Sequence, residues 1–184
     1  MAAYYLREIR KVQPRGPYCI AGYSFGGYIA FEIAQQLRAT GETVGLLGFL
    51  DTIEWQYLQR VGRPQSFGER WRQRLDRLKK GRLDYVKVTV GYNATKMLHR
   101  IFHRLGREVP QQFSNLEDIN RFAMTLYRPT VYPGRLTIFR SLSREAVEND
   151  ELLGWGGMAV EGIEVQDVTG RHLDMLKEPN VRLL

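Results

Sequence analysis

Apolar residues follow two alternating patterns along the chain. Short apolar runs bounded by turn residues predict buried strands. These runs are YCIAG (18–22), VGLLGFL (44–50), RLTIF (135–139) and GIEVQDV (162–168). We expect the first run to be covered on both faces, which would bury Cys19. After that run, residues 25–39 carry apolar side chains at helical spacing, and Gly41 is expected to end this helix.

Helical spacing is also found near both ends of the chain. In residues 2–13 it places Tyr5, Ile9 and Val12 on one side of a predicted amphipathic helix. Charges are spread through this segment, which is unlike the basic head and apolar core of a secretory signal. A closing helix is expected to begin near Asp174.

The order of these elements predicts the fold class. Strands and helices alternate, and this pattern is typical of an α/β protein with a parallel sheet wrapped by helices. Residues 53–127 interrupt the alternation with helical segments rich in arginine and glutamine. We expect this insertion to be a lid, because the strand ends are where sites are built. The length of 184 residues predicts one domain, residues 1–184.

Composition narrows the class of protein. The chain has 43% hydrophobic and 26% charged residues, as ordinary globular proteins do. No apolar run approaches the ~20 residues that cross a bilayer, so no membrane partner is expected. A single cysteine excludes an internal disulfide and favours a reducing compartment. We therefore predict a cytoplasmic protein.

The net charge of +7 is unevenly distributed. Residues 60–107 contain 14 lysines and arginines against three acidic residues, so the remainder of the chain is mildly acidic. Two solvated amphipathic helices would carry such a charge pattern without any binding role. No nucleic-acid recognition motif accompanies the charge, and no nucleic-acid partner is expected.

The most informative motif is GYSFG (22–26), which fits Gly-x-Ser-x-Gly between a strand and a helix. In such a nucleophile elbow the chain reverses sharply and exposes the hydroxyl of Ser24. Side chains at Gly22 and Gly26 would collide, which predicts glycine at both positions. The N–H of Phe25 is the expected oxyanion donor. The alternative is a glycine-rich turn that contains a serine by chance.

A nucleophilic serine needs a base, and the chain has three histidines. His99 and His103 lie four residues apart among arginines and lysines, with no third metal ligand nearby, so we interpret them as solvated lid residues. His172 follows the last predicted strand, where the chain order of α/β-hydrolases puts the base. A purely structural histidine is the alternative there.

The acid that would orient this histidine has several candidates. Asp51 ends the strand after the nucleophile's helix, which holds its carboxylate rigidly at the same edge of the sheet as the serine. Glu145, Glu148 and Asp150 follow the next strand, another position used by such enzymes. Residue type and position slightly favour Asp51, although it could simply cap the following segment.

Five spaced blocks carry a resemblance to a known family. They are GPYCIAGYSFGGYIAFEIAQQL, LLGFLDT, YRPTVYPGRLTIFR, LLGWGGMA and VTGRHLDMLKEPNV. In this order they resemble the releasing (type I) thioesterase domain of nonribosomal peptide and polyketide synthases, an α/β-hydrolase family. The resemblance implies a triad of Ser24, Asp51 and His172. The family more often has aspartate where this chain has Arg171, beside the base.

The resemblance also implies a reaction and a partner. The substrate would be an acyl, polyketide or peptidyl chain on the phosphopantetheine arm of a carrier protein. An acyl-serine intermediate would be released by hydrolysis or macrocyclisation, without a metal or redox cofactor. Carrier proteins are commonly acidic, so the basic insertion would steer their docking.

The family fold begins upstream of this chain, so we expect an N-terminally truncated domain that lacks the first strands. A second oxyanion donor normally comes from that part, and its loss would cost about 10²–10³ in rate. The nucleophile's strand would then have an unpaired edge open to self-association. The alternative function is therefore a catalytically impaired module that binds a carrier or another protein.

Overall fold

The computed structural model describes residues 1–61, 97–98, 100–107, 109–110, 116–142 and 150–184. The chain separates into two compact units. The first unit consists of Met1–Gly62 and Arg128–Leu184, and the second of Arg63–Tyr127. Most of the predicted lid, residues 53–127, lies outside the described residues, so its role stays a prediction.

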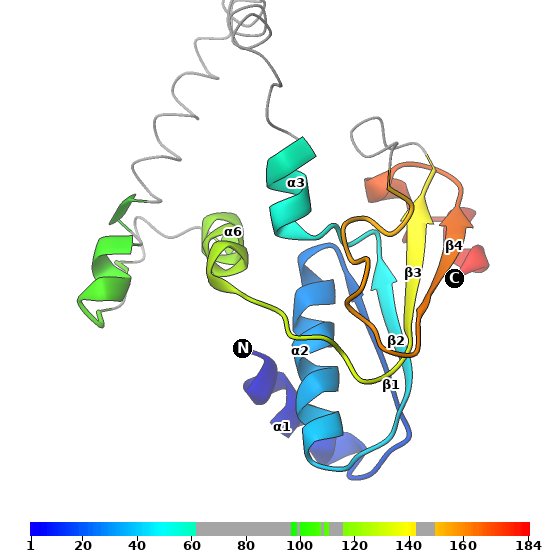
Figure 1. Cartoon of the computed structure of the whole chain (residues 1–184), viewed down its shortest axis with the longest axis horizontal. Helices are drawn as coiled ribbons and strands as arrows, with labels where there is room; N and C mark the ends of the chain where they lie inside the picture. Colours follow the sequence, from blue (N-terminus) through cyan, green and yellow to red (C-terminus); the bar gives the residue numbers. More distant parts are fainter. Residues whose placement is uncertain (62–96, 99, 108, 111–115, 143–149) are drawn as a thin grey trace, which may run out of the picture. The chain divides into compact units, whose positions relative to one another are not determined.

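The first unit contains a four-stranded sheet in the order β1-β2-β3-β4 (Figure 1). The strands are β1 Tyr18–Tyr23, β2 Val44–Leu50, β3 Leu136–Ser141 and β4 Ile163–Val168. Every neighbouring pair is parallel. The carboxyl ends of all four strands therefore meet at one edge of the sheet, where α/β proteins build their sites.

Helix α2, Phe25–Ala39, connects β1 to β2 and packs against both strands. Its end confirms the predicted stop at Gly41, which has a φ of 80°. The Gly41 N–H donates to the Arg38 carbonyl at 3.0 Å, and the Glu42 N–H donates to the Leu37 carbonyl at 3.0 Å. These two bonds form a Schellman motif, in which glycine accepts the left-handed backbone without steric cost.

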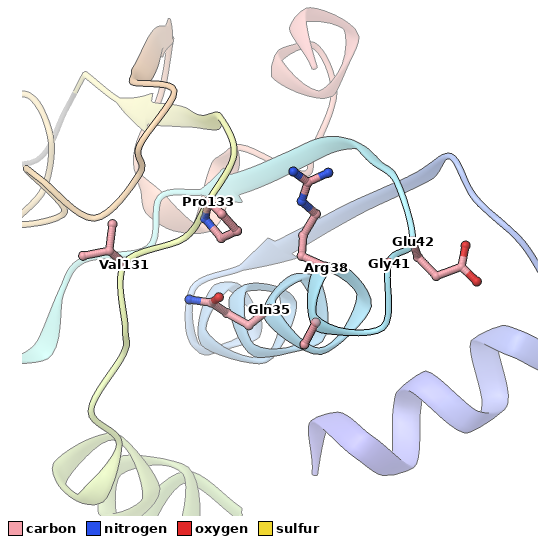
Figure 2. A pocket seen from close by; sticks show the side chains of 7 residues that line it. Gln35, Arg38, Gly41, Glu42, Val131 and Pro133 are labelled. Atoms are coloured by element: carbon pink, nitrogen blue, oxygen red, sulfur yellow. The ribbon is translucent and has the colours of Figure 1, made fainter.

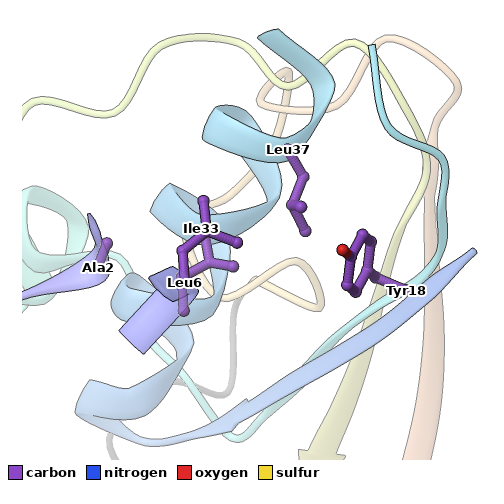
Figure 3. Close-up of a cluster of buried hydrophobic side chains, with 5 residues drawn as sticks. All are labelled: Ala2, Leu6, Tyr18, Ile33 and Leu37. Atoms are coloured by element: carbon purple, nitrogen blue, oxygen red, sulfur yellow. The ribbon is translucent and has the colours of Figure 1, made fainter. Parts of the chain in front are cut away.

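Helix α1, Ala2–Val12, packs on α2 through a face that only partly matches the one predicted. Ala2 and Leu6 are buried with Tyr18, Ile33 and Leu37, and Figure 3 shows these side chains gathered between α1, α2 and β1. Ile9 of the expected face packs against this cluster, whereas Val12 is exposed. The tyrosine ring at position 5 stays half exposed, because the helix turns the shorter side chains of residues 2 and 6 toward α2.

A second group of buried side chains is aromatic and comes from α2, β2 and the loops before β3 and β4. Trp155 is at its centre, with ring centroids 5.3 Å from Phe31, 4.7 Å from Phe49 and 5.4 Å from Tyr28. Phe31 also lies 5.9 Å from Tyr132. Large fully buried rings contribute much of a core's stability, so this group joins α2, β2 and the loop before β4 into one body.

One face of β1 is exposed, which corrects the prediction that this strand is covered on both sides. Cys19 and Ala21 are exposed, whereas Tyr18 and Gly22 on the opposite face are buried. Leu46, the register partner of Cys19, is 38% exposed. An apolar run predicts a strand but does not show whether a second layer covers it.

The remaining described elements are short. Helix α3 spans Trp55–Val61 and helix α6 spans Leu116–Leu126, while 3-10 turns η2 and η3 span His172–Asp174 and Asn180–Leu183. The expected closing helix is wrong, because Pro179 has no N–H to donate and disfavours helical backbone in the residue before it. Among the described residues, no helix has both the length and the apolar character needed to span a membrane.

The packing of α1 yields a stability prediction. Leu6→Ala removes a side chain that is 6% exposed in the cluster of Figure 3, and we expect unfolding free energy to fall by about 2–5 kcal/mol. Val12→Ala changes a side chain that is 89% exposed, so the unfolding free energy should change by less than about 0.5 kcal/mol. Urea unfolding of both variants measures the difference. A loss for Val12→Ala as large as that for Leu6→Ala would contradict this packing of α1.

Candidate active site

Ser24 forms the turn between β1 and α2. Its backbone has φ 53° and ψ −117°, a region that L-residues avoid at a cost of about 1–3 kcal/mol. Hydrogen bonds hold it there: the Ser24 N–H donates to the Leu50 carbonyl at 2.9 Å, and its carbonyl accepts from the Gly27 N–H at 3.1 Å. Phe25 is the first residue of α2, so its N–H lies at the helix N-terminus, where amides lack intrahelical acceptors.

The glycines of the elbow do not share one steric role. A Cβ at Gly22 would lie 2.1 Å from the carbonyl oxygen of Gly26, an impossible contact with backbone. A Cβ at Gly26 would meet nothing within 4 Å, so the expected collision at that position is wrong. Gly27 is the second restricted position, since a Cβ there would lie 2.1 Å from Oγ1 of Thr52. The close approach therefore depends on Gly22 and Gly27.

Thr52 supports the elbow from the end of β2. Its buried hydroxyl donates to the Ser24 carbonyl at 2.8 Å. Its own carbonyl accepts a 2.9 Å hydrogen bond from Nε1 of Trp155. The Tyr28 hydroxyl donates to the carbonyl of Ile53 at 2.6 Å. These bonds bind the segment after β2 to α2 and to the aromatic core, which keeps the strained serine in place.

Asp51 and His172 are brought together from segments 121 residues apart. Nδ1 of His172 lies 2.6 Å from Oδ2 of Asp51, whose side chain is fully buried. Oδ1 of Asp51 accepts a 3.2 Å bond from the backbone N–H of Ser141. The Asp51 N–H donates to the Phe139 carbonyl at 2.8 Å, and its φ is 53°. β3 thus fixes both the backbone and the carboxylate of this aspartate.

This contact determines the tautomer of the imidazole. A carboxylate can only accept hydrogen bonds, so the proton lies on Nδ1 when His172 is neutral. Nε2 then carries the free lone pair and can accept a proton from a hydroxyl. The side chain of His172 remains 26% exposed, which leaves it accessible to a reacting group.

Arg171, the residue before His172, has its charge paired locally. Nε of Arg171 donates to Oδ2 of Asp174 at 3.1 Å. That hydrogen bond lowers the pKa of Asp174, with help from the positive charges of Arg171 and Lys177. The carboxylate therefore stays ionised at neutral pH and offsets the charge of Arg171.

The other candidates from the sequence take no described part in this arrangement. Asp150 accepts bonds from the N–H groups of Leu152 and Gly154, both at 2.9 Å, and so caps a turn. Glu145 and Glu148 lie outside the described residues. His103 is exposed with its ring edge-on to Phe122, and His99 is also outside the described residues.

A surface hollow of about 570 Å³ lies elsewhere in the first unit. It is lined by the last turns of α2 and by Val131 and Pro133, with the side chains of Gln35 and Arg38 pointing toward it (Figure 2). Gln35 is ten residues along α2 from Phe25, which at 1.5 Å per residue is about 15 Å from the elbow. The hollow is therefore separate from the candidate active site.

Comparison with known families now identifies the class of protein. The family model of the thioesterase domain matches residues 1–181, and the chain belongs to this family. It is 26% identical over 191 residues to malpibaldin synthetase of Mortierella alpina, covering 100% of this chain and 3% of that protein. It is 53% identical over 49 residues to inactive atromentin synthetase invA3 of Paxillus involutus, covering 27% of this chain and 5% of that protein.

Solved structures agree on the fold. The NocB thioesterase domain from the nocardicin cluster matches with a TM-score of 0.57 at 22% identity, covering 98% of this chain and 67% of that chain. The SrfTE thioesterase domain, which cyclises the lipopeptide antibiotic surfactin, matches with a TM-score of 0.57 at 18% identity. This match covers 98% of this chain and 68% of that chain. These likenesses confirm the predicted α/β-hydrolase-type fold. The family match confirms the resemblance to a thioesterase domain.

Some contributors to the site were missed by sequence reasoning. Gly27, Thr52 and Trp155 all lie within the blocks that carry the family resemblance, but none has chemistry that singles it out. Tyr23 occupies a variable position of the elbow motif. The one sequence signal for Gly27 is the pair of consecutive glycines, Gly26 and Gly27, which indicates a close approach of the helix to a neighbouring segment.

The elbow sterics predict different outcomes for two similar substitutions. Gly22→Ala forces a methyl group into backbone and should lower unfolding free energy by about 1–3 kcal/mol or more. The methyl group added by Gly26→Ala would meet open space. This substitution should leave the unfolding free energy unchanged or raise it by up to about 1 kcal/mol, because alanine favours the helix more than glycine does. Thermal or urea unfolding of both variants distinguishes them. A large loss for Gly26→Ala would contradict the described packing.

Proposed function

We propose that this chain is a serine thioesterase that releases an acyl, polyketide or peptidyl chain from a phosphopantetheine carrier. The observation that carries the proposal is the 2.6 Å contact of Asp51 with His172 at the sheet edge that also holds the strained Ser24. Membership of the thioesterase domain family supports the reaction class. The synthetases related to this chain support a carrier-bound substrate.

In the proposed first step, Oγ of Ser24 attacks the thioester carbonyl while Nε2 of His172 takes the hydroxyl proton. Asp51 holds the imidazole through Nδ1 and stabilises its cationic form. The oxygen of the tetrahedral intermediate accepts a hydrogen bond from the Phe25 N–H, assisted by the positive end of α2. The C–S bond then breaks, and His172 returns the proton to the departing thiol.

In the second step, water or a nucleophile within the bound chain attacks the acyl-serine. His172 again removes the attacking group's proton and delivers it to Oγ of Ser24, which leaves. Hydrolysis gives an acid, and internal attack gives a ring. The residues proposed here need no metal or redox cofactor for either outcome, since the phosphopantetheine arm belongs to the substrate.

The partner and the location are further parts of the proposal. An acyl or peptidyl carrier protein is the proposed partner, and the basic residues of 60–107 would attract its acidic surface, with residues 53–127 as the lid. A cytoplasmic location is proposed because the single cysteine, Cys19, is free and exposed, a state that reducing compartments preserve.

A second candidate function rests on the open side of the sheet. β1 is at one end of the strand order, and on its far side no described strand pairs with it. The exposed face at Cys19, Ala21 and Leu46 adjoins this edge. Such an edge can accept a strand from another chain, which supports a binding module or a self-associating one.

The decisive test is thioester hydrolysis by the whole chain and by Ser24→Ala. We use an acyl-N-acetylcysteamine thioester and expect Ser24→Ala to fall to the rate of buffer alone, because the nucleophile is gone. Cys19→Ser is the matched control, since its exposed thiol is another nucleophile that could attack a thioester. This control should retain full activity and should still be labelled at Ser24 by an alkyl fluorophosphonate.

Equal, background-level hydrolysis by the wild type and Ser24→Ala would reject the proposed enzyme activity of this chain. Sedimentation then separates the alternatives. A dimer that is lost when a strand-breaking proline replaces Ala21 would support association through β1, whereas a monomer would argue against self-association through that edge.

The choice of acid has its own test. Asp51→Asn keeps the shape of the side chain but reverses the hydrogen bond at Nδ1, so kcat should fall by about 10⁴. Asp150→Asn is the control, because Asp150 caps a turn and does not touch the imidazole in the described structure. Steady-state kinetics of both variants decide the assignment. A greater loss for Asp150→Asn would transfer the role of the acid to that residue.

A further inference from the structure

Tyr23, the residue before the candidate nucleophile, makes two different contacts with His172. The two rings are stacked, with centroids 4.7 Å apart and planes 19° from parallel. The Tyr23 hydroxyl also donates a 2.7 Å hydrogen bond to the backbone carbonyl of His172. These residues are 149 positions apart in the chain, so the contact joins the elbow to the loop after β4.

The two contacts act on different parts of the histidine. The hydrogen bond holds the backbone of His172, the first residue of η2. Two residues earlier, Gly170 turns the chain with a φ of 92°. The stacked ring covers one face of the imidazole and limits rotation of its plane. Asp51 holds the ring edge at Nδ1. Backbone, face and edge of His172 are therefore each restrained by a separate group.

We propose that Tyr23 is a positioning residue for His172, which keeps the imidazole at a fixed place relative to Ser24. The catalytic consequence of this role rests on the proposed function. Tyr23 is peptide-bonded to Ser24, so a shift of the elbow moves the ring that restrains the histidine. The separation of nucleophile and base is thereby kept within the small tolerance that proton transfer allows.

The role is divided between the hydroxyl and the ring, and two substitutions separate them. Tyr23→Phe removes the hydrogen bond to the His172 carbonyl but keeps the stacked ring. Tyr23→Leu removes both. Tyr18→Phe is a matched control on the same strand, because its buried hydroxyl also donates to a carbonyl, that of Gln13 at 3.0 Å, but it belongs to the core cluster far from the histidine.

The first readout is the proton resonance of His172 Cε1–H in the full chain, assigned by its absence from His172→Gln. A proton over an aromatic face is shielded, so Tyr23→Leu should move this resonance downfield, whereas Tyr23→Phe and Tyr18→Phe should leave it close to the wild-type position. This readout does not depend on activity. An unchanged resonance in a folded Tyr23→Leu would overturn the inference.

The second readout is the split between kcat and KM for the acyl-N-acetylcysteamine thioester. We expect Tyr23→Phe to lower kcat by about 3- to 10-fold, the effect of one net hydrogen bond. Tyr23→Leu should lower it by about 100-fold, with KM unchanged in both. Tyr18→Phe should leave both constants unaltered.

The outcomes separate the two proposals. A raised KM at constant kcat would mean that Tyr23 contacts the acyl chain and would overturn the positioning role. If wild type and Ser24→Ala hydrolyse the thioester equally, the proposed function fails. The resonance of His172 then still decides whether Tyr23 restrains the imidazole. Should Tyr23→Leu not fold, Tyr23→Phe carries the test through its predicted loss of kcat relative to Tyr18→Phe.

Discussion

The candidate site depends on one close approach of backbones, where β1 at Gly22 meets the first turn of α2. The Gly22 Cα faces the carbonyl of Gly26 so closely that no side chain fits between them. This approach turns the chain through the strained conformation of Ser24 and brings the helix N-terminus beside the hydroxyl. The strained backbone of Ser24 persists because hydrogen bonds from neighbouring segments hold it in this conformation.

One of those bonds comes from Thr52 in the segment that follows β2, and the same segment contains Asp51, the proposed acid. Thr52 donates to the Ser24 carbonyl, while Asp51, one residue earlier, lies against His172. The indole N–H of Trp155 donates to the Thr52 carbonyl and so fixes this segment to the aromatic core. The candidate nucleophile and Asp51 therefore share a common support, and Tyr23 connects the elbow to His172.

Several expectations from the sequence failed for related reasons. Gly26 was assigned a steric role that belongs to Gly27, because the motif does not specify which surface the helix approaches. Cys19 was expected to be buried, but strand pattern carries no information about a covering layer. On α1 the buried position next to Ile9 is Leu6 and not Tyr5, because the spacing of apolar residues fitted both and only packing on α2 distinguishes them.

The sequence by itself determined the strands, helix α2, its glycine stop and the elbow around Ser24. These features depend on neighbours within a few residues, so spacing and residue type are sufficient to encode them. Family resemblance added the pairing of Asp51 with His172, for which spacing alone left other acids open. Only the tertiary structure decided the contacts of Tyr23 and Thr52. Those contacts join residues 149 and 28 positions apart, and their geometry follows from the register of the parallel strands and the packing of α2, which no local pattern records.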